Sequence, residues 1–150
     1  MNYDSLIKDL TKNPTQKSIG TDKGLAKIGD GVVNLIYSVA KSIILTNNSK
    51  LNNSIRTGKK VSKRILGDAL KRAEMKDFAK TRADAHDLAD TVEAIVAYIW
   101  FKNIMSIKEM IDFLVKHLAG DLYDINEEIE QATIALTDLL NHIKQYLPKE

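Results

Sequence analysis

Apolar positions recur at intervals of three and four along most of the chain, the spacing that places side chains on one face of an α-helix. The longest such segment is 22–45, whose apolar face comprises Leu25, Ile28, Val32, Leu35, Ile36, Val39, Ile43 and Ile44. Similar patterns predict helices over 5–10, 59–75, 84–102, 107–119 and 126–147. There is almost no strand signal. The sequence therefore predicts an all-α fold.

Polar and turn-forming residues separate these segments. Asparagine-rich runs predict a loop over 46–57, and Gly120-Asp121 predicts the turn before the last helix. The chain has 150 residues, of which 44% are hydrophobic and 28% are charged, which suits one globular domain with its own core. We expect a single domain over 1–150, with a core at about 15–119 and a C-terminal helical extension at about 121–147.

Three carboxylates interrupt the apolar segments of two predicted helices. Asp30 lies in the first long helix, and Asp90 and Glu93 lie three residues apart, and so on one face, in the helix over 84–102. A lone buried charge costs on the order of several kcal/mol unless something compensates it. If the helices pack together, the three carboxylates offer the oxygen ligands that Mg²⁺ or Mn²⁺ prefers. Helix capping, or pairing with Lys and Arg, is the alternative.

The residues around these carboxylates resemble a known family. The segment 25–35 (LAKIGDGVVNL) resembles the signature helix of the ribonuclease III endonuclease domain, and 88–99 (LADTVEAIVAYI) resembles its second acidic helix. The resemblance covers about 15–119. It is closest to the compact mini-ribonuclease III type, which lacks a double-stranded-RNA-binding domain and has a similar Leu-Ala-x-Ile-Gly-Asp run.

This resemblance implies a ribonuclease III-like helical domain that acts as a homodimer and uses Mg²⁺, with Mn²⁺ as a substitute, to hydrolyse double-stranded or structured RNA. It assigns Asp30 and Glu93 as catalytic residues, and Asp30, Asp90 and Glu93 as metal ligands. The chain departs from the family pattern at two acidic positions, which are Ala26 and Lys23 here. The departure leaves open a non-catalytic RNA-binding or ribosome-associated relative. A helical interaction module without any RNA role is a third alternative.

Charge is distributed unevenly along the chain. Residues 47–84 contain eleven Lys or Arg and four acids, whereas 106–150 contain four and nine. A basic segment can bind the phosphate backbone of RNA, although such a charge run is also typical of a solvated helix face. The predicted RNA-binding residues are Lys59, Lys60, Lys63, Arg64, Lys80 and Arg82.

Two further charged residues lie one helical turn from the predicted ligands. Asp87 precedes Asp90 by three positions, and Lys27 precedes Asp30 by three. Asp87 is therefore a candidate to orient water beside the metal ligands, and Lys27 is a candidate to contact a phosphate of the substrate. A salt bridge is the simpler role for both. Apolar positions near Val33, Ile36 and Tyr37 predict the subunit interface of the dimer.

Several classes of site are excluded by composition and spacing. The chain has no cysteine, which removes disulfides, thiol catalysis and cysteine-type zinc sites. Its three histidines lack zinc-site spacing, and Gly58-Lys59 lacks the first glycine and the preceding strand of a phosphate loop, so we expect no nucleotide cofactor. The amino terminus does not resemble a secretion signal, and the apolar stretch at 95–101 is too short for a bilayer. We expect a cytoplasmic protein with no membrane partner.

Overall fold

The computed structural model describes residues 3–150, and none of these residues lies in a strand. The all-α prediction is confirmed. The α-helices are α1 (Gln16–Gly20), α2 (Lys23–Asn47), α3 (Lys63–Arg72), α4 (Ala85–Phe101), α5 (Ile107–His117) and α6 (Ile125–Ile143). Short 3-10 helices lie at Asp4–Leu6, Lys8–Leu10, Lys76–Phe78 and Lys144–Tyr146. The sequence pattern predicted α2, α4, α5 and α6 to within a few residues, but it did not predict α1.

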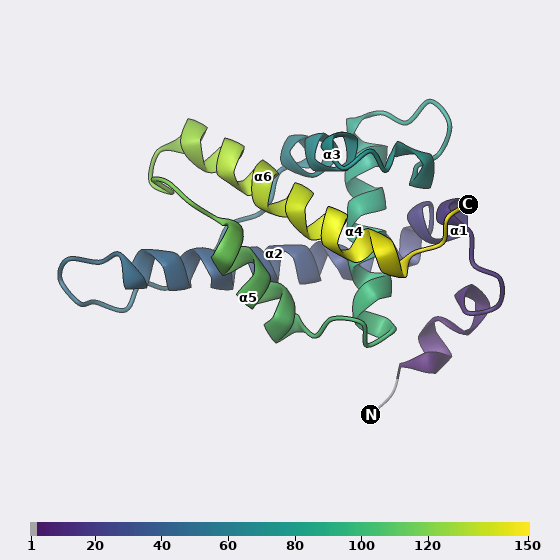
Figure 1. Cartoon of the computed structure of the whole chain (residues 1–150), viewed down its shortest axis with the longest axis horizontal. Coiled ribbons are helices and arrows are strands. Elements are labelled where there is room, and N and C mark those ends of the chain that lie inside the picture. The colour runs from purple at the N-terminus through teal and green to yellow at the C-terminus, as the bar shows by residue number, and fades with distance from the viewer. Residues whose placement is uncertain (1–2) are drawn as a thin grey trace.

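Helices α2 and α4 cross at the centre of the fold (Figure 1). Gly29 of α2 lies at the crossing, where a Cβ atom in its place would be only 1.8 Å from the carbonyl oxygen of Glu93 on α4. The two backbones can approach this closely because glycine has no side chain. The crossing therefore brings Asp30, the next residue of α2, beside Glu93.

The hydrophobic core surrounds this crossing. Every residue of α4 from 91 to 99 is buried, while α5 packs on α2 and α3 packs on both α4 and α6. Helix α6 contributes side chains to the same core, among them Leu136 and Leu139. Val33, Ile36 and Tyr37 are at most 1% exposed inside this core. They cannot also contact a second subunit, so the prediction that they form the interface is wrong.

Helix α2 is long and apolar enough, by length and composition alone, to cross a membrane, with a mean hydropathy of 1.4 over its best window. The sequence pattern alone predicts no membrane-spanning segment over these residues. In the structure α2 packs against α4 and α5 and buries ten of its residues. That packing is the one expected of the central helix of a helical domain.

The predicted basic helix over 59–75 is shorter in the structure, because α3 begins only at Lys63. Ser62 caps it, and its hydroxyl accepts a hydrogen bond from the Ile65 amide at 3.2 Å. The preceding residues 55–61 run in an extended conformation beside α2 instead. They are held there by backbone hydrogen bonds to polar side chains of that helix.

These polar side chains recur every fourth residue on α2. The amides of Val61, Lys59, Thr57 and Ile55 donate to Asn34, Ser38, Ser42 and Thr46 at 2.8, 2.8, 2.9 and 2.8 Å respectively. Four helical residues advance the chain by about 6 Å, close to the roughly 6.6 Å advance of two extended residues. The match in spacing fixes the extended segment along α2, and through it Lys60 comes to line the same cavity as Asp30.

Candidate active site

An open cavity of about 520 Å³ lies where α2, α4, the extended segment and the start of α3 meet. It is lined by Lys23, Ala26, Lys27, Asp30, Lys60, Val61, Lys63, Leu66, His86, Asp90 and Glu93. The structure thus brings the three predicted metal ligands to one cavity. Two of the six predicted RNA-binding residues, Lys60 and Lys63, and the predicted supporting residue Lys27 line the same cavity.

Asp30 and Glu93 form a carboxyl pair within this cavity. Glu93 is buried, and burial, together with the hydrogen bond and negative charge of Asp30, raises the pKa of Glu93 to about 8. Asp30 also accepts a hydrogen bond from the Asn34 side-chain amide at 3.1 Å. Because burial and the neighbouring carboxylate both disfavour its ionised form, Glu93 retains its proton near neutral pH.

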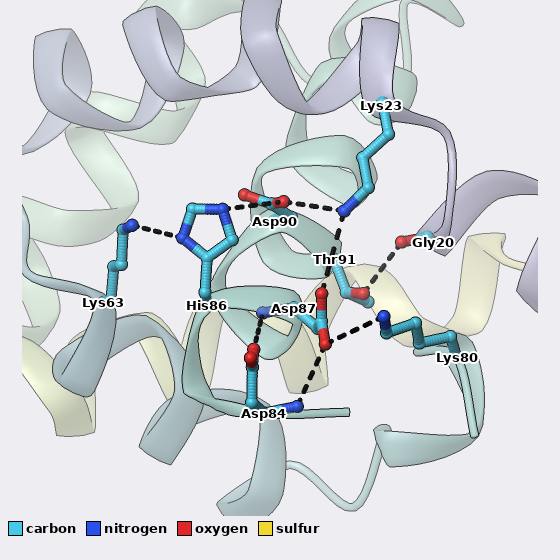
Figure 2. A network of polar contacts seen from close by, with 9 residues as sticks. All are labelled: Gly20, Lys23, Lys63, Lys80, Asp84, His86, Asp87, Asp90 and Thr91. Carbon is cyan, nitrogen blue, oxygen red and sulfur yellow. Dashed lines mark hydrogen bonds and ion pairs between the residues drawn. The ribbon is translucent and has the colours of Figure 1, made fainter. Parts of the chain in front are cut away.

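Asp90 lies in a different polar network (Figure 2). Its Oδ2 atom is 2.9 Å from the Lys23 Nζ atom and 3.5 Å from His86 Nε2. His86 in turn is hydrogen-bonded through Nδ1 to the ammonium of Lys63. Within residues 3–150, no three acidic or histidine side chains gather closely enough to hold a metal ion among them. The assignment of Asp30, Asp90 and Glu93 as a joint ligand set stays a prediction.

Asp87 caps the helix and forms ion pairs. Its carboxylate accepts a hydrogen bond from the Asp84 amide at 3.1 Å while Asp84 accepts one from the Asp87 amide at 2.8 Å, so the two residues form the N-terminal cap of α4. The Asp84 amide and the ammonium of Lys80, 3.3 Å away, hold the pKa of Asp87 below its usual range. Asp87 does not line the large cavity.

The other predicted RNA-binding residues lie around the cavity or beyond it. Lys59 turns toward the buried Glu128 of α6, at 3.5 Å, and Arg64 lies 3.9 Å from Asp68 on the exposed side of α3. Lys80 pairs with Asp87, and Arg82 is exposed with a backbone φ of 59°. RNA binding by these residues stays a prediction.

Three residues that sequence reasoning did not assign to the site contact its carboxylates. Lys23 and His86 contact Asp90, and Asn34 contacts Asp30. Two of these contacts could have been expected from the spacing of the residues along a helix. His86 lies four residues before Asp90, and Asn34 follows Asp30 by four in the polar series of α2. The pairing of Lys23 with Asp90, 67 residues away, has no local signal.

The carboxyl pair suits a hard divalent cation. Asp30 and Glu93 supply oxygen donors, and a bound cation could take the place of the proton that burial and the neighbouring Asp30 favour on Glu93. Mg²⁺ is commonly bound through one or two carboxylates, with water and substrate phosphate completing its coordination. The residues present therefore fit Mg²⁺ at Asp30 and Glu93, with Asp90 in reach of the same cavity.

A comparison with protein families supplies the identity of the fold. The family model described as Ribonuclease III matches residues 23–149, which is most of the chain. The chain belongs to the Ribonuclease III family. This membership indicates an endoribonuclease type of protein that has RNA as its substrate. A comparison with curated proteins finds no match.

Proposed function

We propose that this protein is a Mg²⁺-dependent endoribonuclease that hydrolyses phosphodiester bonds in double-stranded or structured RNA during RNA processing. The observation that carries the proposal is one cavity lined by both carboxylates and lysines: Asp30, Asp90 and Glu93 beside Lys60 and Lys63. Carboxylates suit a divalent cation, and lysines suit the phosphates of the substrate. Membership of the Ribonuclease III family supports the same activity.

Asp30 and Glu93 would hold Mg²⁺, or Mn²⁺ in its place, and Asp90 is the further candidate ligand. When bound, the cation supplies an activated water and neutralises charge that develops on the phosphodiester. Asn34 keeps the Asp30 carboxylate in position, and burial fixes Glu93. Lys60 and Lys63 would bind the phosphates that flank the cleaved bond.

The surrounding basic residues would hold a duplex by its backbone. To do so, Lys59, Arg64 and Lys80 would exchange their acidic partners for phosphates. The exposed Arg82 would bind phosphate beside them. Duplex RNA is recognised mostly through its shape, its phosphates and its 2′-hydroxyls, so a basic surface suits it better than an aromatic one.

We also propose that the active unit is a homodimer formed through the exposed apolar face of α2. Ile28 and Leu35 are 41% and 49% exposed, lie two helical turns apart on one face, and are followed by the half-buried Val39. A two-fold axis at this face would present the same patch from both subunits. Two cavities would then act on one duplex.

The test is a cleavage assay on structured RNA with Mg²⁺, with and without chelator. Asp30→Asn and Glu93→Gln should each lower the cleavage rate at least about 100-fold, since removing even a supporting group of a metal site costs about 10- to 100-fold. Salt-dependent RNA binding should persist in both variants. Asp112→Asn is the matched control, because Asp112 is exposed on α5, pairs with Lys108 and does not line the cavity. Wild-type rates in both site variants would refute the assignment.

A second candidate function is RNA binding without catalysis. It is favoured by the lining of the cavity, where four lysines outnumber three acids and where Ala26 and Lys23 replace acidic positions of the family pattern. The same assay separates the two functions. Salt-dependent RNA binding with no cleavage in either Mg²⁺ or Mn²⁺ would establish the second.

A further inference from the structure

Of the lysines that line the cavity, Lys23 forms an ion pair with a predicted metal ligand. It is the first residue of α2, whose N-cap Asp22 accepts a hydrogen bond from the Leu25 amide at 2.8 Å. From this fixed helix end the Lys23 side chain reaches across to α4 (Figure 2). Its Nζ atom lies 2.9 Å from Asp90 Oδ2 and 3.8 Å from Asp87 Oδ1.

Of these two carboxylates, Asp90 is the main partner of Lys23. Asp87 already accepts the Asp84 amide and pairs with Lys80, whereas the closest cation to Asp90 is Lys23. A lysine ammonium carries its charge at physiological pH, so the 2.9 Å contact places a positive charge directly on the Asp90 carboxylate. Asp90 therefore has an ammonium as its closest charged partner in the protein without metal.

The ammonium changes the charge balance of the cavity. Asp30, Asp90 and Glu93 supply three potential negative charges, and Lys23, Lys27, Lys60 and Lys63 supply four positive ones. A divalent cation that used Asp90 would lie close to the ammonium and would be repelled by it. Among residues 3–150, no lysine forms an ion pair with Asp30 or Glu93, so this carboxyl pair is the better place for an ion.

We propose that Lys23 is a built-in cation of this site: its ammonium occupies Asp90, so that the cavity takes one divalent ion, at Asp30 and Glu93. Lys23 is then a positioning residue that sets the number of bound metals. The inference rests on the metal site of the proposed function. It concerns metal binding in the absence of RNA, so it can be measured without any cleavage.

The experiment counts Mn²⁺ ions bound to the whole, metal-free protein, with free Mn²⁺ followed by electron paramagnetic resonance. The wild-type protein should bind one Mn²⁺ per chain. Lys23→Met should free Asp90 and either admit a second ion or tighten the first by about 10-fold, the scale expected on removing a nearby like charge. Lys23→Arg keeps the charge and should bind one ion, as the wild type does.

Lys27→Met is the matched control. Lys27 lines the same cavity, and within the described part of the chain its side chain has no ion-pair partner. Its replacement removes the same charge from the cavity without freeing Asp90. One bound ion, with an affinity change well below that of Lys23→Met, is the expected result. Adding Asp90→Asn to Lys23→Met should abolish the gain, and circular dichroism should show that every variant is folded.

Four results would overturn the inference: two ions on the wild-type protein, no ion on it, no gain in Lys23→Met, or an equal gain in Lys27→Met. The outcome is distinct from that of the proposed function. A protein that binds one Mn²⁺ and gains a second in Lys23→Met, yet does not cut RNA, supports the role of Lys23 while refuting the nuclease. A wild-type protein that cuts RNA and binds two ions would support the nuclease and refute the role of Lys23.

Discussion

Replacing Gly29 by alanine should open the central helix crossing. The new Cβ atom would lie 1.8 Å from the carbonyl oxygen, 2.4 Å from the carbonyl carbon and 2.9 Å from the Cα atom of Glu93. All three are backbone atoms, so no side chain can turn away. Ordinary contact begins at 3.4 Å, which means that α2 and α4 must separate by about 1.6 Å at this point.

The expected loss of folding stability follows from the extent of the contact between α2 and α4. Overpacking a core by one methyl group typically costs about 1–3 kcal/mol. The α2–α4 contact is the most extensive pair in the fold, and neither backbone is free to move alone, so we expect about 3 kcal/mol or more. At about 2–4 °C per kcal/mol for a chain of this size, Tm should fall by roughly 6–12 °C.

The assay is thermal and urea unfolding followed by circular dichroism, with Gly31→Ala as the control. A Cβ atom at Gly31, two residues along the same helix, would meet nothing within 4 Å. Alanine is favoured over glycine inside a helix by about 1 kcal/mol, so Gly31→Ala should raise Tm by about 2–4 °C. If Gly29→Ala were as stable as Gly31→Ala, the close crossing, and with it the pairing of Asp30 with Glu93, would be refuted.

Three further predictions concern assembly, RNA binding and pH. Leu35→Glu should convert a dimer to a monomer in sedimentation at micromolar concentration. Leu51→Glu, at a 79%-exposed position in the loop that follows α2, should leave the dimer intact. A monomeric wild-type protein would contradict the dimer. Neutralising Lys59, Lys60, Lys63 and Arg64 together should flatten the dependence of RNA binding on salt by about one unit of slope per lost phosphate contact. Neutralising Lys108 and Lys116, the control, should leave the slope unchanged. An unchanged slope in the first variant would mean that RNA binds elsewhere on the protein. Glu93 has a pKa of about 8 in the folded protein and 4.5 in the unfolded chain, so the folded state binds its proton more tightly. The free energy of unfolding of the metal-free protein should therefore fall as pH rises between these values, and Glu93→Gln should flatten this pH dependence. An equal slope in the variant would show that another group controls the pH dependence.

The sequence by itself determined the helices and the class of fold. The apolar repeat at three and four residues is a local property of each helix, so it located α2, α4, α5 and α6 without knowledge of their neighbours. It also placed Asp30 and Glu93 in two helices whose flanking residues resemble ribonuclease III, and the family comparison agrees. That each carboxylate interrupts an apolar run was visible from the residues alone.

Tertiary structure decided which side chains meet. The pattern predicted a helix from residue 59, but hydrogen bonds to side chains of α2 hold 55–61 extended. The local sequence does not show these hydrogen bonds, because their partners lie on another helix. It marked Val33 and Ile36 as apolar, yet only the packing of α4 and α5 shows that they face the core rather than a partner. The ion pair of Lys23 with Asp90 joins residues 67 positions apart. Such contacts depend on where two helices cross, and a crossing is set by the packing of the whole core rather than by the spacing of residues within either helix.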